Sequence, residues 1–240
     1  MPDQRPTLLL TRPKPESDRF AEEFCKRFGV GWPVVISPLM KIIALHAEIP
    51  AEAADASLVF TSANAVAPFV ALSPAAGRRA YCVGDRTAQV AADMGFDAIA
   101  GPGDAERLIP LITAQATGKL IHARGRHTIT NLAERLNLAG IETYEALVYD
   151  QLEQRLTGAA HKALMGPRAV IVPIFSPRTA RIFVGQFDGA AQVLHFAAIS
   201  AAAAQPLNTL CPARLELAPT PDAPGIWLAL ARLPGVGVAG

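Results

Sequence analysis

Short apolar runs alternate along the chain with longer segments in which apolar residues recur at helical spacing. The run Thr7–Thr11 is almost wholly apolar, which is typical of a buried strand. The next segment, Ser17–Phe28, carries a phenylalanine at every fourth position and ends before Gly29, which indicates an amphipathic helix with a glycine stop. The same alternation of strand and helix continues to the C-terminal region.

The pattern predicts roughly ten strands, more than the five or six of an ordinary sheet. The predicted strands are Thr7–Thr11, Val34–Ser37, Leu58–Thr61, Ala80–Val83, Ala98–Ala100, Lys119–Ala123, Glu142–Tyr149, Ala169–Phe175, His195–Ile199 and Arg214–Ala218. The predicted helices are Ser17–Phe28, Ala63–Leu72, Arg86–Met94, Ala105–Thr113, Ile129–Ala139, Ala159–Met165, Thr179–Phe187, a weak alanine-rich helix after Ile199, and Pro221–Leu233. Strict alternation predicts parallel sheets covered by helices on both faces. We therefore expect an α/β protein with two doubly wound parallel-sheet domains.

Small hydroxyl residues, glycines and arginines gather directly after the predicted strands. In doubly wound sheets, ligands bind at the carboxyl ends of the strands, where helix N-termini attract anions and arginine forks bind carboxylates. Serine and threonine at these positions are equally the residue types that cap helices, so the pattern alone indicates only an anion-binding cleft. The candidate binding residues are Arg12, Lys14, Thr61, Ser62, Asn64, Arg86, Thr87, Arg124, Ser176, Arg178 and Ser200.

Composition narrows the class of protein. Of the 240 residues, 51% are hydrophobic and 18% are charged, enough apolar material for real cores and too much for a disordered chain. The formal net charge of +1 provides no overall field for nucleic acid or a membrane surface. The N-terminal residues lack a secretory apolar core, and no run approaches the roughly 18 apolar residues of a membrane span. We expect a cytoplasmic protein that contacts neither nucleic acid nor membrane.

Several catalytic and cofactor motifs are missing from the sequence. It contains no dinucleotide or phosphate-loop glycine motif, no G-x-S-x-G and no H-E-x-x-H. The cysteines Cys25, Cys82 and Cys211 form no C-x-x-C and are interpreted as core fillers. His122 and His127 lack metal-ligand spacing and are interpreted as structural or solvated residues. We expect no metal and no cofactor.

The strand-end motifs, taken in order, resemble the uroporphyrinogen-III synthase family over nearly the whole chain. They are Leu-Thr-Arg-Pro at 10–13, Val-Phe-Thr-Ser-Ala-Asn-Ala-Val at 59–66, Val-Gly-Asp-Arg-Thr-Ala at 83–88, Ala-Glu-Arg-Leu at 105–108, Arg-Gly at 124–125, Val-Tyr at 148–149 and Phe-Ser-Pro at 175–177. Three features depart from the family pattern. Ile199–Leu207 carries alanines where the family has a hydroxyl residue, Pro173 lies inside a predicted strand, and Arg178 follows Ser176-Pro177.

The resemblance implies an architecture as well as a fold class. Family members have two α/β domains joined by a two-stranded linker, with the active site in the interdomain cleft. Carried over, this gives a discontinuous domain at residues 1–38 and 152–240 and an inserted domain at 39–151. One linker strand would end near Tyr149, and the other would lie near Pro38–Ile43.

The resemblance also implies an activity. The family are lyases of tetrapyrrole and heme biosynthesis that cyclise hydroxymethylbilane to uroporphyrinogen III. The reaction inverts ring D, loses water and passes through a spiro intermediate, without a cofactor. By its match to the family's Val-Tyr motif, Tyr149 is the candidate catalytic residue, a proton donor to the leaving hydroxyl; packing of a linker-strand aromatic is the alternative. The protein is expected to act as a monomer.

Two other kinds of protein share this strand–helix pattern. A non-catalytic two-lobed binding protein for a small polyanionic ligand would have the same fold and the same strand-end residues. A nucleotide-dependent α/β enzyme or receiver-like domain is disfavoured, because the sequence has no phosphate loop and its first strand ends in Thr-Arg-Pro, without acidic residues.

Overall fold

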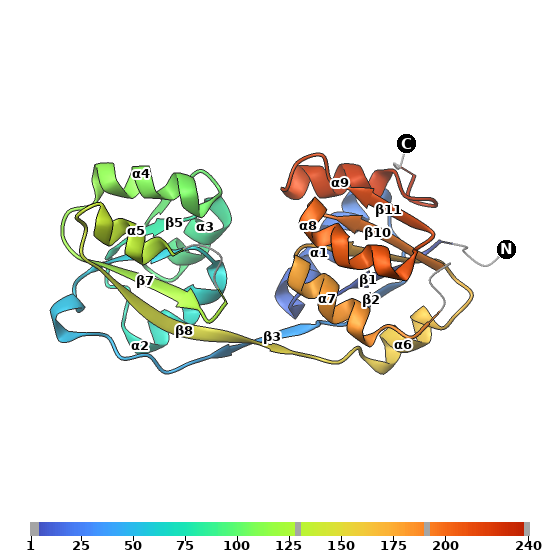
Figure 1. Cartoon of the computed structure of the whole chain (residues 1–240), viewed down its shortest axis with the longest axis horizontal. Helices are drawn as coiled ribbons and strands as arrows, with labels where there is room; N and C mark the ends of the chain where they lie inside the picture. Colours follow the sequence, from blue (N-terminus) through green and yellow to red (C-terminus); the bar gives the residue numbers. More distant parts are fainter. Residues whose placement is uncertain (1–4, 128–130, 190–192, 238–240) are drawn as a thin grey trace. The chain divides into compact units, whose positions relative to one another are not determined.

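The computed structural model describes residues 5–127, 131–189 and 193–237. The chain divides into two compact units, unit 1 at Met1–Lys41 with Glu153–Gly240 and unit 2 at Ile42–Leu152 (Figure 1). Each unit holds a sheet of mainly parallel strands, so the predicted α/β fold class with two parallel sheets is confirmed.

Unit 1 contains a five-stranded sheet with the order β11-β10-β9-β1-β2. Its strands are β1 (Thr7–Leu10), β2 (Val34–Ile36), β9 (Val170–Ile174), β10 (Leu194–Ala198) and β11 (Arg214–Leu217). Its helices are α1 (Lys14–Phe28), α6 (Gly158–Leu164), α7 (Pro177–Gln186), α8 (Ala201–Ala204), the 3-10 helix η4 (Gln205–Leu210) and α9 (Ala223–Ala231).

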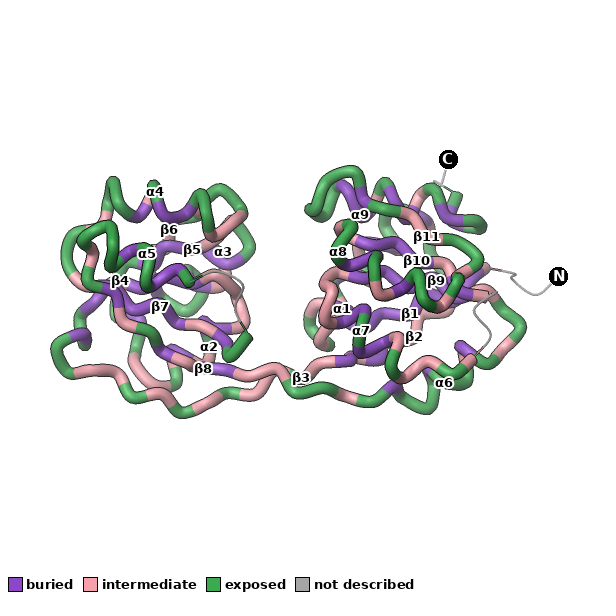
Figure 2. The backbone as a smooth tube through the Cα atoms, in the orientation of Figure 1, coloured by how far each residue is buried: buried purple, intermediate pink, exposed green. Residues whose placement is uncertain are grey.

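The two faces of the unit 1 sheet are buried by different helices. Leu8 and Leu10 pack with the phenylalanines of α1 and with α9, whereas Leu9 packs on the opposite face with α6, α7 and α8. This alternation follows from the two-residue period of a strand. In Figure 2 the strands of the unit are largely buried and the outer sides of its helices are exposed. The all-apolar strand pattern of the sequence thus reflects a sheet covered on both sides.

Unit 2 contains a six-stranded sheet with the order β3-β8-β7-β4-β5-β6. Its strands are β3 (Met40–Ala44), β4 (Ser57–Phe60), β5 (Arg79–Cys82), β6 (Asp97–Ala100), β7 (Leu120–Gly125) and β8 (Thr143–Glu153). Its helices are the 3-10 helices η1 (Ala51–Ala53) and η2 (Ala63–Ala65), followed by α2 (Val66–Leu72), α3 (Asp85–Asp93), α4 (Ala105–Gln115) and α5 (Leu132–Leu138).

The unit 2 sheet is likewise covered on both faces. Leu58 and Phe60 pack against α2 and α3, and Phe60 makes edge contacts with Phe69 and Phe96. Val59 points to the other face, where α4 and α5 pack. These two apolar layers hold β4 rigidly in the middle of the sheet, and the residues that follow β4 are therefore well positioned.

Each sheet has one point where the strand order reverses. In unit 2 the chain runs outward from β4 to β5 and β6, then returns to the other side of β4 for β7 and β8. In unit 1 the same reversal falls between β1 and β9. A crevice forms at such a point because the connections leave the two neighbouring strands in opposite directions. The residues that follow β4 and β7 are therefore the first place to look for a binding site.

Element boundaries differ from the predictions at a few positions. Helix α1 begins at Lys14, before the predicted Ser17, because Pro15 occupies its first turn without losing a needed hydrogen bond. Strand β8 continues to Glu153, beyond the predicted end at Tyr149, and β3 is its neighbour in the sheet. The beginning of the helix predicted at Ile129 lies outside the described residues, and α5 is described from Leu132. Among the described residues, no helix is both long and apolar enough to span a bilayer.

Candidate functional site

A pocket of about 420 Å³ lies in unit 2 at the carboxyl ends of the strands on both sides of the reversal point. Three of the predicted site residues line it, namely Thr61, Ser62 and Tyr149. The other lining residues are Val83, Gly103, Asp104, Ala105, Glu106, His122, Gly125 and His127. The pocket thus combines hydroxyl groups, two imidazoles and two carboxylates.

Thr61 and Ser62 follow β4 directly. Ser62 is the N-cap of η2, and its hydroxyl accepts a hydrogen bond from the Asn64 backbone N–H at 3.2 Å. This is the capping role that serine is suited to. Ser62 also contacts the phenol of Tyr149, since a hydrogen bond between the two side chains acts on the pKa of the phenol. Ser62 therefore caps η2 and lines the pocket with the same hydroxyl group.

Tyr149 is placed by an irregularity in the strand pairing. Arg124 pairs with Leu147, but the next residue, Gly125, pairs with Tyr149, so the register shifts by one at this point. The Arg126 N–H then donates to the Tyr149 carbonyl at 3.1 Å. A β-bulge of this kind redirects a side chain, and here it brings the phenol to the carboxyl end of the sheet.

The ring of Tyr149 lies directly on Gly125. A Cβ atom added to Gly125 would be 2.5 Å from Cζ and 2.8 Å from the hydroxyl oxygen of Tyr149. Tyr149 is only 6% exposed and belongs to the apolar cluster on the α2 and α3 face. Burial raises the pKa of its phenol, opposed by the hydrogen bond from Ser62, so the phenol keeps its proton at neutral pH.

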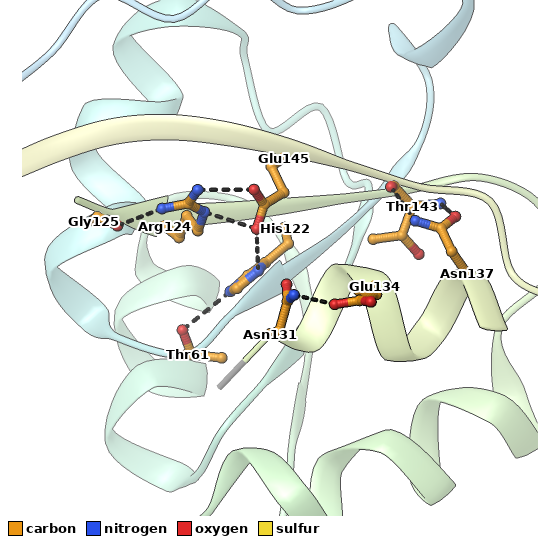
Figure 3. A network of polar contacts seen from close by, with 9 residues as sticks. All are labelled: Thr61, His122, Arg124, Gly125, Asn131, Glu134, Asn137, Thr143 and Glu145. Carbon is orange, nitrogen blue, oxygen red and sulfur yellow. Dashed lines mark hydrogen bonds and ion pairs between the residues drawn. The ribbon is translucent and has the colours of Figure 1, made fainter. Parts of the chain in front are cut away.

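His122 is a buried polar residue inside β7. Its side chain is 1% exposed, and its Nε2 lies 3.2 Å from Thr61 Oγ1 (Figure 3). Its Nδ1 lies 4.0 Å from Glu145 Oε1 and has no hydrogen-bond partner among the described residues. Burial lowers the pKa of His122 to about 4; Glu145 raises it and Arg124 lowers it by smaller amounts. The imidazole is therefore neutral at pH 7.

The cations near the pocket are bound to carboxylates of the protein. Arg124 donates from Nε and Nη2 to the two oxygens of Glu145, both at 2.8 Å. Arg126 donates to Asp150 at 2.7 Å, and this pairing lowers the pKa of Asp150. Asp150 also lies 3.6 Å from His127 Nε2.

The acidic side of the pocket is formed at the start of α4. Asp104 is the N-cap of this helix and accepts from the Arg107 backbone N–H at 2.7 Å, which lowers the pKa of Asp104. The preceding loop passes close to β5, because a Cβ on Gly101 would lie 2.7 Å from the Cys82 carbonyl oxygen. Glu106 pairs with Arg135 of α5. The loop is thus fixed against the sheet next to Val83.

Four predicted binding residues of unit 2 do not line the pocket. Asn64 supplies the backbone N–H to Ser62, while Arg86 and Thr87 lie in the first turn of α3, exposed and buried respectively. Arg124 does not line the pocket, although His122 and Gly125 next to it do.

The predicted residues of unit 1 lie at the carboxyl ends of its own strands. The Arg12 guanidinium lies 4.5 Å from the centre of the Phe175 ring, next to the reversal point between β1 and β9. Lys14 forms an exposed pair with Asp18 at 2.9 Å. Ser176 and Ser200 are the N-caps of α7 and α8, and Arg178 lies in the first turn of α7.

Sequence reasoning missed most of the non-hydroxyl lining residues. His122 and His127 were expected to be structural or solvated, and Gly125 was noted only as part of an Arg-Gly motif. A signal for His122 was present, because a histidine within the apolar strand Leu-Ile-His-Ala needs a reason to be buried. Gly103 and Asp104 reach the pocket from the loop before α4, and Glu106 from the first turn of that helix. Strand and helix patterns do not predict the course of this loop.

The architecture and the pocket define a class, namely two-unit α/β proteins with a ligand site at the carboxyl ends of parallel strands. A family model described as uroporphyrinogen-III synthase HemD matches residues 18–227. The chain belongs to the uroporphyrinogen-III synthase family.

One solved structure supports the fold. The chain is similar to the crystal structure of uroporphyrinogen-III synthetase from Helicobacter pylori 26695, with 20% identity, a TM-score of 0.65, and coverage of 94% of this chain and 99% of that one. A mutant uroporphyrinogen III synthase from the extremely thermophilic bacterium Thermus thermophilus is similar at 15% identity with a TM-score of 0.48, covering 87% of this chain and 92% of that one. No curated protein matches the chain.

Replacing Gly125 with alanine should displace the Tyr149 ring. The added methyl group would overlap the phenol, and overpacking of this kind costs about 1–3 kcal/mol. We expect a lower midpoint in thermal unfolding of Gly125→Ala. Gly185→Ala is the matched control, because Gly185 lies within α7 with nothing within 4 Å of the added atom, and alanine favours the helix. An unchanged midpoint for Gly125→Ala would contradict the packing described here.

His122 should make the stability of unit 2 depend on pH. Its folded pKa of about 4 lies below the ordinary value of 6.5, so the unfolded chain binds more protons between these values. Stability is therefore lost as the pH falls from about 6.5 to about 4, by up to about 3 kcal/mol from this group. Urea unfolding at pH 7 and pH 4.5 should show a smaller loss for His122→Gln than for the wild type. The exposed His46 provides the control, since His46→Gln should keep the full loss.

Proposed function

We propose that this chain is a uroporphyrinogen-III synthase that cyclises hydroxymethylbilane to uroporphyrinogen III. Ring D is inverted and water is lost, through a spiro intermediate. The enzyme is a cofactor-independent lyase of heme biosynthesis and works as a cytoplasmic monomer. Membership of the family supports the assignment. The observation that carries it is the buried Tyr149 phenol at the strand ends of unit 2, hydrogen-bonded to Ser62 within the pocket.

The substrate brings its own nucleophile and electron donors. Loss of the ring A hydroxyl, assisted by the ring nitrogen, gives an azafulvene cation. The substituted carbon of ring D attacks this cation, and the spiro product reopens and recloses with ring D inverted. The protein therefore has to fold the chain, exclude water and stabilise charge, tasks of positioning and electrostatics. A pocket of hydroxyls and imidazoles suits this chemistry.

Tyr149 is the proton donor, or hydrogen-bond donor, to the departing hydroxyl in this proposal. Burial raises the pKa of the phenol, which keeps it protonated at neutral pH and able to donate. A phenol is a weak acid, so its contribution falls at the low end of the range for general acids, about a hundredfold. The Ser62 hydroxyl donates a hydrogen bond to the phenol oxygen.

The remaining strand-end residues have a carboxylate-binding role in the proposal. Hydroxyl and backbone N–H groups would bind the acetate and propionate arms, and basic side chains would supply positive potential. The hydroxyl and amide residues are Ser62, Asn64, Thr87, Ser176 and Ser200. The basic residues are Arg12, Lys14, Arg86, Arg124 and Arg178.

An isomer assay tests the activity. Hydroxymethylbilane closes spontaneously to the type I isomer, so the purified protein should divert the product to type III. The two isomers are separated by chromatography after oxidation to the porphyrins. A product that is type I only, at the spontaneous rate, would favour a two-lobed binding protein of the same fold.

The Tyr149→Phe variant tests the proposed donor. We expect turnover to fall about a hundredfold with the thermal midpoint nearly unchanged, because the ring remains and only the hydroxyl is lost. Tyr144→Phe is the matched control on the same strand, since its hydroxyl bonds Glu142 and Lys119 outside the pocket. Equal turnover of the two variants would remove Tyr149 from the mechanism.

A further inference from the structure

In the polar network around His122, only Arg124 has a role in the proposed function, and Thr61, His122 and Glu145 have none there. Three neighbouring strands contribute to it, with Thr61 after β4, His122 and Arg124 on β7, and Glu145 on β8. Figure 3 shows a continuous series from the Thr61 hydroxyl through the imidazole to the Glu145 carboxylate and the Arg124 guanidinium. Thr61 and His122 both line the pocket.

The carboxylate beyond the ring determines which nitrogen carries the proton. The neutral imidazole has one N–H and one lone pair. Nδ1 is 4.0 Å from Glu145 Oε1, and a lone pair at that position would face a carboxylate. Arg124 fixes the Glu145 carboxylate in place through two hydrogen bonds. Of these two charged groups, the Glu145 carboxylate has the larger electrostatic effect on the pKa of His122. The arrangement therefore favours the proton on Nδ1.

The other nitrogen is then an acceptor. With the proton on Nδ1, the Nε2 lone pair accepts the Thr61 hydroxyl proton across the 3.2 Å between the two atoms. The Thr61 oxygen keeps only lone pairs for whatever enters the pocket. A threonine hydroxyl that rotates freely can donate to a ligand or accept from it. Because the Thr61 hydroxyl donates its proton to the His122 ring, its oxygen can only accept from a ligand.

The charges of the pocket lining point the same way. Its ionisable lining residues, among those described, are Asp104, Glu106, His122, His127 and Tyr149, without lysine or arginine. A ligand carboxylate next to Thr61 would face an acceptor oxygen and a lining with two carboxylates. A ligand N–H at the same place would face the Thr61 oxygen as an acceptor, in a lining that contains the carboxylates of Asp104 and Glu106.

We infer that His122 is a positioning residue that fixes the Thr61 hydroxyl as a hydrogen-bond acceptor, so that this part of the pocket binds a pyrrole N–H group and no carboxylate. The inference gives Thr61 a role different from the acid binding expected from its place after a strand. The assignment of a pyrrole as the donor rests on the proposed function, whereas the acceptor state of Thr61 does not.

The tautomer of His122 is the first test, and it needs no activity. In protein labelled with 15N histidine, long-range 1H–15N spectra at pH 7 distinguish a protonated from an unprotonated ring nitrogen. The His122→Gln variant identifies the signal by its absence. We expect Nδ1 protonated and Nε2 unprotonated. The opposite tautomer, or a charged ring, would overturn the inference.

A pair of small probes tests the ligand group. The molecules 2,5-dimethylpyrrole and 1,2,5-trimethylpyrrole differ mainly by the N–H, and each is titrated to millimolar concentration. The Nε2 signal of His122 should move at least threefold more with the first probe, because a donor to Thr61 polarises the hydroxyl that bonds Nε2. Equal or absent shifts with both probes would overturn the inference.

Turnover provides the third test once the wild type has been shown to form the type III isomer. Thr61→Ser keeps the hydroxyl, and Thr61→Val removes it at nearly the same volume. We expect Thr61→Val to lower kcat/KM at least tenfold and Thr61→Ser by less than threefold. His122→Gln, whose amide oxygen can accept the Thr61 proton, should retain more activity than His122→Leu. Equal values within both pairs would overturn the inference, while a wild type without type III product would overturn the proposed function alone.

Discussion

The parallel pairing of β4 with β7 determines where the polar side chains of the pocket lie. Val59 pairs with His122 and Phe60 with Ala123, and one residue later β4 ends and the chain turns into η2. The reversal of strand order at this pair leaves the carboxyl ends of the two strands accessible. Apolar layers on both faces hold the pair in register, so that Thr61 and His122 meet without any dedicated loop. A slip of one residue would place His122 on the opposite face of the sheet.

A second constraint is the bulge between Arg124 and Gly125. It makes Gly125 the partner of Tyr149, and only a residue without a side chain leaves room for the ring there. Tyr149 belongs to the apolar cluster and lines the pocket at the same time. Core packing and proton donation are therefore not competing explanations of this residue. Packing holds the ring, and the hydroxyl at its end is available for chemistry.

The regular part of the fold could be predicted from the sequence because apolar periodicity reflects the two buried faces of each sheet. Strands such as Thr7–Leu10 and Val170–Ile174 correspond closely to apolar runs. The extent of β8 was not predictable in this way, because beyond Tyr149 the strand carries polar residues that no core requires. A strand near β3 was expected only through the family resemblance, since its half-buried and exposed residues leave little apolar signal.

The candidate site could be predicted only in part from the sequence. Thr61 and Ser62 follow β4, and Tyr149 ends a strand predicted from the sequence, although β8 itself continues to Glu153. The carboxyl ends of strands are where ligands bind in a doubly wound fold. His122 depends on cross-strand contacts with Thr61 and Glu145, which are distant in sequence and need the strand order to be known.

The ion pairs around the pocket bear on how a polyacid could bind at all. Arg124, Arg126, Arg107 and Arg135 are each bound to a carboxylate of the protein. A substrate carboxylate that binds one of these guanidinium groups has to displace a protein carboxylate. For the exposed pairs this displacement needs little free energy, because such an ion pair contributes only about 0–1 kcal/mol to stability. For Arg124, whose side chain is 22% exposed and bound at two oxygens, it costs more and would also release the Glu145 carboxylate that faces His122. Carboxylate binding at Arg124 and the acceptor state of Thr61 are thus opposed through one shared residue, and a substrate that uses both pyrrole N–H groups and acids would bind its acids at the outer, exposed arginines.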